Sequence, residues 1–248
     1  MNKYYKEFTI PYFDTDSEKL IKMHKILTYM AETSLWHSDN VGLGIDDIRK
    51  EDYGWMLIKW ELEIMKYPKA KDVVTIVTWT SGFERFYASR QFQMYNSKGE
   101  ELAKASSLWV FLDINKRRPI RIPNYIIEKY SVTKQENFKE FSSIEVEGDL
   151  LFKSEEFIVA ENDLDNNNHV NNIRYIEWLL IGLAERQNKY QIKRLAMNYK
   201  KELLLGDRVC TEIIETEHDN KLYHKVMTSE GLNAVAMTLW EKKETSKI

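Results

Sequence analysis

The residues best suited to chemistry lie in the run ENDLDNNNHVNNIRYIEWLL, residues 161–180. Carboxylate, amide and imidazole side chains alternate there at Asp163, Asp165, Asn167 and His169. Such groups orient water, transfer protons and stabilise a developing oxyanion. Apolar residues at helical spacing follow, so we expect the run to open a helix, whose unpaired N–H groups favour negative charge. A single Asn or Asp is enough to cap a helix, so the surplus indicates a polar catalytic site.

Composition indicates a soluble globular protein of one large domain or two small ones. The 248 residues include 36 basic and 39 acidic side chains, so the net charge is −3. This balance does not favour nucleic acid or a membrane as the main partner. One cysteine, Cys210, rules out an internal disulfide and points to a reducing compartment. Neither a signal peptide nor a membrane-spanning run is apparent, so we expect a cytoplasmic protein.

The elements that position the polar run are predicted to occur twice. Each half reads as a strand, a long helix and a series of antiparallel strands, with the helices over residues 17–42 and 170–188. Asp14 and Asp16 are expected to cap the first helix. The expected strands are residues 4–13, 59–64, 73–79, 87–95 and 102–112, then 157–160, 194–201, 208–217, 222–229 and 233–241. Residues 96–99 read as a hairpin turn and 125–130 as a short helix.

Matching segments in the same order indicate an internal duplication. The pairs are Asp14-Thr-Asp16 with Asp163-Leu-Asp165, Ile64 to Val74 with Tyr199 to Val209, and Ala105-x-x-Leu108-Trp109 with Ala236-x-x-Leu239-Trp240. We therefore predict an N-terminal repeat over residues 1–130, a polar linker over 131–150 and a C-terminal repeat over 151–248. A helix followed by hairpin-connected strands predicts an α+β fold in which an antiparallel sheet wraps the helix.

The motif Asp163-Leu-Asp165-Asn-Asn167-Asn-His169, with Tyr175-Ile-Glu-Trp178 after it, resembles the acyl-acyl carrier protein (ACP) thioesterases of plants and bacteria. Tyr67-Pro68 with Asp72-Val73-Val74, and Ala105 with Trp109-Val110, resemble the same family, and the similarity runs from about Phe8 to Trp240. The resemblance implies a tandem hotdog fold. It also implies a hydrolase that releases free fatty acid from fatty acyl-ACP in fatty acid biosynthesis, without cofactor or metal.

By that resemblance, Asp165, Asn167 and His169 match the family's catalytic residues, and Glu202 matches the acidic residue of a later motif. We expect Asp165 and Glu202 to position and deprotonate water, but which of them takes the proton is open. The plant enzymes carry a cysteine just after that acid, whereas this chain has Leu203. Direct attack by water is therefore expected, and Cys210 is expected to be small buried filling.

The first repeat lacks the polar set, because Glu18, Leu20 and Tyr67 stand where the second has Asn167, His169 and Glu202. We infer one active site per chain, in the C-terminal repeat. In the family the acyl chain lies in the first hotdog, so the N-terminal repeat is expected to bind it without taking part in catalysis. The candidate lining residues, for which ordinary core packing is the alternative, are Met23, Ile26, Met30, Trp55, Met56 and Trp60.

Other polar residues carry less weight. Four histidines show no metal-ligand spacing and are expected at the surface or at caps: His24, His37, His218 and His224. Two basic groups are candidates for docking an acidic carrier protein: Lys116, Arg117, Arg118 and Arg121, and Lys193, Arg194, Lys200 and Lys201. A solvated charged face is the alternative for both groups.

Other functions remain open from the sequence. The same fold serves acyl-CoA thioesterases and, as a weaker candidate, hydroxyacyl dehydratases. A non-catalytic acyl-binding module is a third possibility, against which the complete polar set argues. The sequence does not fix the chain length of the substrate. Whether the chain acts alone or as a homodimer is also open.

Overall fold

The computed structural model describes residues 3–218 and 220–243 of the chain. Its contacts divide the chain into two compact units, Met1–Phe141 (unit 1) and Ser142–Ile248 (unit 2). The border between them lies inside the stretch expected to be a linker. No helix within the described ranges is both long enough and apolar enough to cross a membrane.

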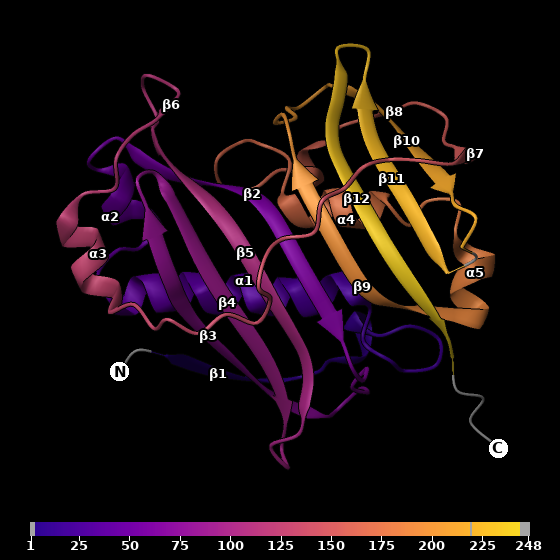
Figure 1. The fold of residues 1–248 in the computed structure, drawn as a ribbon, viewed down its shortest axis with the longest axis horizontal. Helices are drawn as coiled ribbons and strands as arrows, with labels where there is room; N and C mark the ends of the chain where they lie inside the picture. Colours follow the sequence, from indigo (N-terminus) through magenta and orange to yellow (C-terminus); the bar gives the residue numbers. More distant parts are fainter. Residues whose placement is uncertain (1–2, 219, 244–248) are drawn as a thin grey trace. The chain divides into compact units, whose positions relative to one another are not determined.

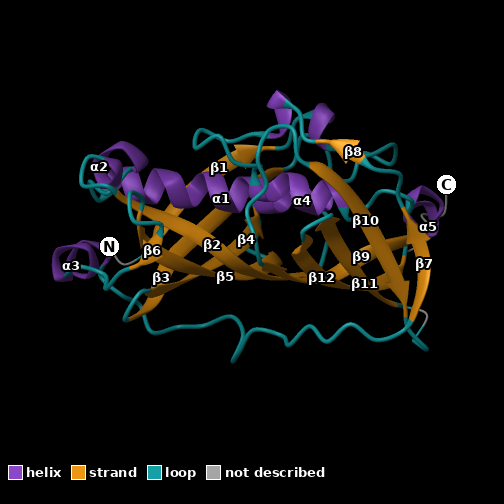
Figure 2. Ribbon diagram, turned by 90° about the horizontal axis from the view of Figure 1, so that it is seen from above, coloured by secondary structure: helices purple, strands orange, loops and turns teal. Residues whose placement is uncertain are grey.

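Unit 1 combines a sheet with one long helix. Its elements are β1 (Tyr4–Thr9), the short 3₁₀ turn η1 (Tyr12–Asp14), α1 (Met23–Asn40), α2 (Ile45–Arg49), β2 (Tyr53–Ile64), β3 (Val73–Glu84), β4 (Tyr87–Asn96), β5 (Glu101–Asp113), β6 (Arg118–Pro119) and α3 (Asn124–Tyr130) (Figure 1). The strand order β1-β3-β4-β5-β2 is antiparallel throughout. Figure 2 shows α1 lying along one face of this sheet.

The core of unit 1 lies between α1 and the sheet. Met23, Ile26 and Met30 recur at helical spacing and are at most 5% exposed. Trp60 of β2 and Phe92 of β4 are also buried, with their ring centroids 5.2 Å apart. Burying each such side chain contributes about 1.5–3 kcal/mol, so this face of α1 fixes the helix on the sheet.

Unit 2 repeats the plan with shorter helices. Its elements are β7 (Asp149–Lys153), β8 (Phe157–Ile158), the 3₁₀ turn η2 (Glu161–Asp163), α4 (Asn172–Trp178), α5 (Ala184–Lys189), β9 (Tyr190–Tyr199), β10 (Arg208–Glu215), β11 (Lys221–Thr228) and β12 (Gly231–Lys242). The strand order is β9-β12-β11-β10-β7, and β8 pairs with β10. Each unit is thus a helix against an antiparallel sheet, and the expected α+β tandem hotdog fold is confirmed.

The expected helix over residues 170–188 is interrupted. α4 ends at Trp178 and α5 begins at Ala184, with Gly182 between them at φ +86°. A Cβ at Gly182 would lie 2.6 Å from the ring of Phe152 in β7. Glycine is therefore required where the chain turns against β7, and the turn ends the first helix.

The stretch expected to be a linker contains no helix or strand from residue 131 to 148, yet it packs on both units. In unit 1 the Asn137 side-chain amide donates to the carbonyl oxygens of Phe92 and Ala105, at 2.8 Å each. In unit 2 Ile144 and Val146 pack against the buried cluster Ala196, Ile214, Tyr223 and Met237. This segment therefore covers sheet surface that would otherwise be exposed.

Candidate active site

Asp165 organises a tight turn in unit 2. Its Oδ1 accepts hydrogen bonds from the backbone N–H groups of Asn167 (2.8 Å) and His169 (3.3 Å). Its Oδ2 accepts from the Asn167 side-chain amide at 3.3 Å. Its own N–H donates to the carbonyl oxygen of His169 at 2.8 Å, and Asn168 takes φ +61°. Both carboxylate oxygens of Asp165 are thus engaged in holding the turn.

Glu202 is brought to this turn by the chain that follows β9. His169 forms an isolated antiparallel bridge with Leu204, and the Val170 N–H donates to the Leu203 carbonyl oxygen at 2.9 Å. These backbone contacts place His169 Nε2 3.6 Å from Glu202 Oε2. Both side chains are about one third exposed, at 35% and 34%, so a substrate can reach them. The structure therefore brings together the four residues singled out from the sequence, Asp165, Asn167, His169 and Glu202.

The same turn occurs in unit 1 without the polar side chains. Asp16 Oδ1 accepts from the N–H groups of Glu18 (2.9 Å) and Leu20 (3.0 Å), and Lys19 takes φ +64°. Leu20 forms the bridge with Lys69 that His169 forms with Leu204. The backbone of the turn is thus common to both repeats, and the polar side chains of the second are additions to it.

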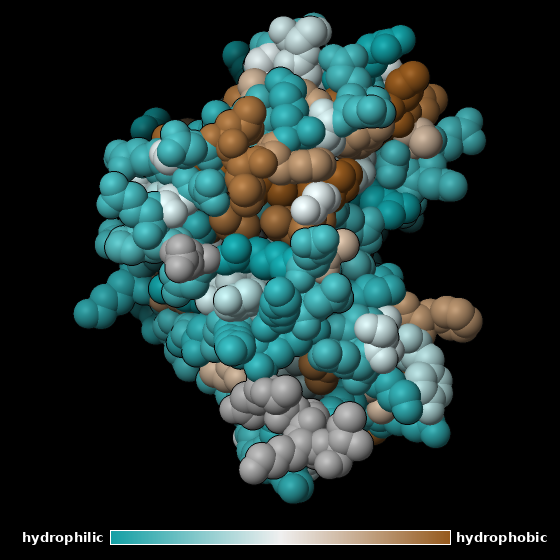
Figure 3. Space-filling model, turned by 90° about the vertical axis from the view of Figure 1, so that its right-hand side faces the viewer, coloured by the Kyte–Doolittle hydropathy of each residue, from teal (hydrophilic) through white to brown (hydrophobic). Residues whose placement is uncertain are grey.

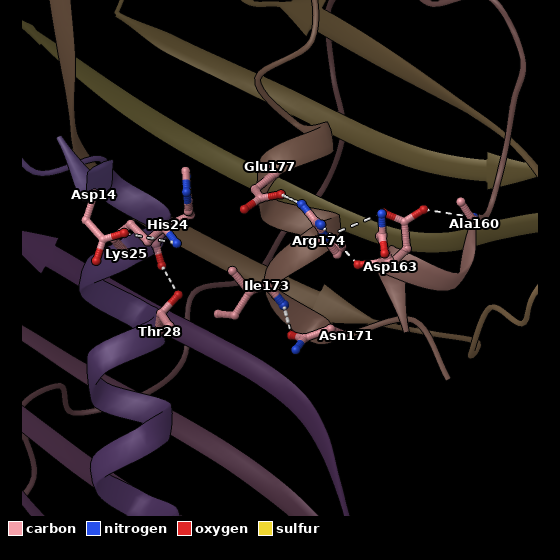
Figure 4. Close-up of polar contacts among 11 residues, drawn as sticks. Asp14, His24, Lys25, Thr28, Ala160, Asp163, Asn171, Ile173, Arg174 and Glu177 are labelled. Atoms are coloured by element: carbon pink, nitrogen blue, oxygen red, sulfur yellow. Dashed lines mark hydrogen bonds and ion pairs between the residues drawn. The ribbon is translucent and has the colours of Figure 1, made fainter. Parts of the chain in front are cut away.

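An ion pair is also repeated. In unit 1 Lys25 Nζ lies 3.2 Å from Asp14 Oδ1, and in unit 2 Arg174 Nε lies 3.4 Å from Asp163 Oδ1 (Figure 4). Arg174 also contacts Glu177 and donates to the Asn162 carbonyl oxygen at 3.0 Å. Asp163 and Arg174 therefore link the turn to α4.

The helix in unit 2 starts later than expected. Asn171 is the N-cap of α4 and accepts from the Ile173 N–H at 2.9 Å. The N–H groups of Val170 and Asn171 donate to the carbonyl oxygens of Leu203 and Asp163. The expectation that the helix begins at Val170 and offers N–H groups to an oxyanion there is therefore wrong, because these donors are already used. Likewise α1 begins at Met23, so Asp14 and Asp16 shape a turn and do not cap it.

The residues expected to bind the acyl chain lie in unit 1 but do not all point the same way. Met23, Ile26, Met30 and Trp60 are in the core, whereas Trp55 and Met56 are half-buried. As neighbours on β2, Trp55 and Met56 point to opposite faces of the sheet. Trp60 Nε1 is buried without a hydrogen-bond acceptor among the described residues. An unpaired N–H in an apolar core costs free energy.

Two histidines expected at the surface are buried. His37 is 3% exposed and accepts from the Arg90 guanidinium at 2.9 Å, while Arg90 lies over the Tyr130 ring. Burial, together with the nearby Arg90 charge, lowers the pKa of His37 to about 3. His224 is 1% exposed beside Thr238, and burial lowers its pKa to about 3 as well. No local sequence pattern indicates the burial of these histidines, because the partner of each lies on another element.

Possible metal ligands and exposed apolar side chains near the site bear on what unit 2 can bind. Within the described ranges, no group of three or more His, Cys, Asp or Glu side chains is arranged to hold a metal. Apolar side chains gather on one face in the view of Figure 3. The exposed large apolar residues of unit 2 include Leu150, Leu151, Ile158, Ile181, Leu204 and Leu205. Leu204 and Leu205 come just after Glu202 and the buried Leu203, so the site has an apolar border on that side.

Two family models match the chain, one in each of its two halves. The model of the acyl-ACP thioesterase N-terminal domain matches residues 1–130, and that of the C-terminal domain matches residues 149–242. Oleoyl-ACP thioesterase 2 of Arabidopsis thaliana, a chloroplastic protein, is 25% identical over 92% of this chain and 67% of its own length. A chloroplastic palmitoyl-ACP thioesterase of the same plant is 28% identical over 79% of this chain and 51% of its own length.

Solved structures share the fold at lower identity. The 12:0-ACP thioesterase of Umbellularia californica superposes with a TM-score of 0.90 over 98% of each chain, at 19% identity. An acyl-ACP thioesterase of Bacteroides thetaiotaomicron superposes with a TM-score of 0.87 at 22% identity, over 97% of this chain and 98% of that one. With both domain models matched in order across a duplicated fold, the chain belongs to the acyl-ACP thioesterase family.

Proposed function

We propose that this chain hydrolyses the thioester of fatty acyl-ACP and releases free fatty acid, which ends chain elongation in fatty acid biosynthesis. The observation that carries the proposal is a polar cluster, the pair Asn167 and His169 on one turn of unit 2 with Glu202 brought to that turn by the chain after β9. The matching turn of unit 1 keeps the backbone and lacks the cluster. Folding therefore does not require these side chains, and their presence together is best explained by catalysis.

In the proposed reaction, water attacks the thioester carbonyl carbon and the carbon–sulfur bond breaks. A carboxylate takes a proton from the water, and the departing thiolate is protonated to give the thiol of the carrier. Because a thiolate is a good leaving group, the enzyme mainly has to orient the water and stabilise the oxyanion. The amide of Asn167 and the imidazole of His169 supply hydrogen bonds for these two tasks.

Glu202 is the better candidate for the base. Both oxygens of Asp165 accept hydrogen bonds within the turn, and Asp16 makes the same two backbone bonds in the repeat that lacks the cluster. Asp165 is thus a positioning residue, which places the backbone of His169 and the amide of Asn167. Glu202 presents its carboxylate toward His169, from a side chain that solvent can reach.

The test is thiol release from acyl-ACPs of increasing chain length and from the matching acyl-CoAs. Glu202→Gln should lower kcat about 10²–10⁴-fold while the protein stays folded. Asp165→Asn keeps an oxygen for the two backbone N–H groups and should retain kcat within about tenfold. Asp16→Asn is the matched control, because it changes the same turn in unit 1. A loss in Asp165→Asn as large as in Glu202→Gln would instead make Asp165 the base.

For the acyl chain, we propose the core of unit 1 between α1 and the sheet, lined by Met23, Ile26, Met30 and Trp60. Enlarging a side chain there, as in Met30→Phe, should shift the preferred substrate to shorter chains. An unchanged chain-length profile in that variant would leave these residues as ordinary core.

The rival functions give different results in the same assay. Release from acyl-CoA alone would make the chain an acyl-CoA thioesterase, and binding without release would make it an acyl-binding module. A cytoplasmic location, supported by the single cysteine, also stays a proposal, which cell fractionation would test. Whether two chains associate is a question for light scattering of the purified protein.

A further inference from the structure

The turn of unit 1 that matches the active-site turn is exposed and carries side chains of another kind. Tyr12 is 55% exposed and Phe13 is 94% exposed. The other members of this surface are four exposed lysines, Lys19, Lys22, Lys69 and Lys71. We refer to these six residues as the aromatic–basic surface.

Contacts show that these residues form one surface. Lys22 Nζ donates to the Phe13 carbonyl oxygen at 3.3 Å, and Lys71 Nζ lies 5.5 Å from the centre of the Tyr12 ring. The Lys19 carbonyl oxygen accepts from the N–H of Ala70, which joins the two lysine-bearing loops. Lys69 is next to Ala70, so Lys19 and Lys69 lie on the same two joined loops as Lys22 and Lys71.

The lysine charges are not neutralised within the unit. Among the described residues, none of the four lysines takes part in an ion pair. The nearby carboxylates have other partners, since Asp14 pairs with Lys25, Asp16 holds the turn and Asp72 accepts from the Lys69 backbone N–H. Glu18 also lies in this turn. The surface therefore presents more positive than negative charge that is free to meet a partner.

The second repeat shows that the fold does not require aromatic and basic side chains at these positions. The matching positions of unit 2 hold Glu161, Asn162, Asn168, Asn171, Leu204 and Gly206 in place of Tyr12, Phe13, Lys19, Lys22, Lys69 and Lys71. The two turns share their backbone hydrogen bonds, so both sets of side chains suit the same structure. A nearly fully exposed phenylalanine gains nothing from folding, which leaves binding as its use.

We propose that the aromatic–basic surface docks the acidic carrier protein that bears the acyl group, an inference that rests on the proposed function. Aromatic side chains anchor protein interfaces because they bury a large area at little entropic cost. Lysines at the rim attract an acidic partner and raise its rate of association. This surface differs from the docking groups expected from sequence, in which Lys116 and Lys193 are already paired with Asp113 and Glu241.

The variants that test docking are chosen to spare the fold. Lys22→Glu/Lys69→Glu reverses two charges and avoids Lys19 and Lys71, which hold φ of +64° and +73°. Phe13→Ser removes the aromatic side chain without opening a cavity. Lys98→Glu/Lys134→Glu is the matched control, with the same charge change at exposed positions elsewhere in unit 1.

The measurement is kcat/KM on acyl-ACP and on an acyl thioester of N-acetylcysteamine, which has neither protein nor phosphate. We expect each surface variant to lose about tenfold on acyl-ACP at low salt, and the charge-reversal loss to shrink as salt rises. On the small thioester all variants should match wild type. The docking proposal alone would be overturned if the surface variants had the same kcat/KM on acyl-ACP as wild type. It would also be overturned if the control variant lost as much kcat/KM as they do. Wild type that hydrolyses neither substrate would overturn the proposed function as well.

Discussion

Acid should destabilise this protein through its two buried histidines. His37 and His224 have pKa values lowered from 6.5 to about 3 by burial. The unfolded state therefore binds more protons than the folded state between pH 6.5 and about 3. Stability conferred by each neutral imidazole is complete above pH 6.5 and is lost as pH falls across this interval.

The size of the effect follows from these pKa values. Lowering the pH from 7 to 5 protonates the unfolded imidazole but not the folded one, which costs about 2 kcal/mol for each histidine. The cost for both is about 4 kcal/mol, a large share of the 5–15 kcal/mol typical of folded proteins. The neighbouring charges act in the same direction, since Arg90 faces His37 and Arg186 lies near His224.

Urea unfolding at pH 7, 6 and 5, followed by tryptophan fluorescence, measures this effect. His37→Gln and His224→Gln keep a polar side chain that does not titrate in this range, and each should remove about 2 kcal/mol of the pH 7 to pH 5 difference. His218→Gln is the control, because His218 is exposed on a turn and should leave the difference unchanged. The reasoning is refuted if the double variant His37→Gln/His224→Gln loses as much stability between pH 7 and pH 5 as wild type.

Three further variants test the packing by urea or thermal unfolding. Arg90→Met removes a buried cation that has no carboxylate partner among the described residues. The free energy of unfolding should therefore stay within about 1 kcal/mol of wild type or rise. A loss of about 3–5 kcal/mol would show that the surrounding groups compensate the buried charge well. Gly148→Ala should lower the free energy of unfolding by more than about 2 kcal/mol, because its Cβ would lie 1.9 Å from the Glu215 carbonyl oxygen. Gly99→Ala should lower it by only about 1 kcal/mol, because the surroundings of Gly99 are open. Equal losses in the two variants would contradict this account. Asn137→Ala should cost about 1–3 kcal/mol, because two strand carbonyls lose their bond to its side chain, and an unchanged stability would mean that water replaces it.

The fold was predictable because its signals are local and occur twice. The strands other than β6 and β7 follow from alternation and residue type, although β2 starts at Tyr53 and so extends further than expected. The hairpin at residues 96–99 is confirmed by the bond from the Gly99 N–H to the Asn96 carbonyl oxygen. Strand β7 was missed, since only Phe152 among its five residues is even half-buried and no alternation marks it.

The details of the site were less predictable because they depend on contacts between distant segments. From sequence, Asp16 and Asp165 suit a helix cap as well as a turn. The choice is made by the bridges to Lys69 and Leu204, which lie in another loop. The same holds for His37, whose burial depends on Arg90, a residue 53 positions away. The catalytic assignments themselves remain predictions from the motif.

The repeated turn also bears on how such proteins can change over generations. Asp16 and Asp165 hold the backbone of the turn in the two units. At the positions of Asn167, His169 and Glu202, unit 1 has Glu18, Leu20 and Tyr67 and still forms the turn. Once selection for turnover is relaxed, these three positions can drift without harming the fold. Inactive descendants that keep the binding surfaces are therefore easily reached, and lineages that lose hydrolysis should retain both aspartates.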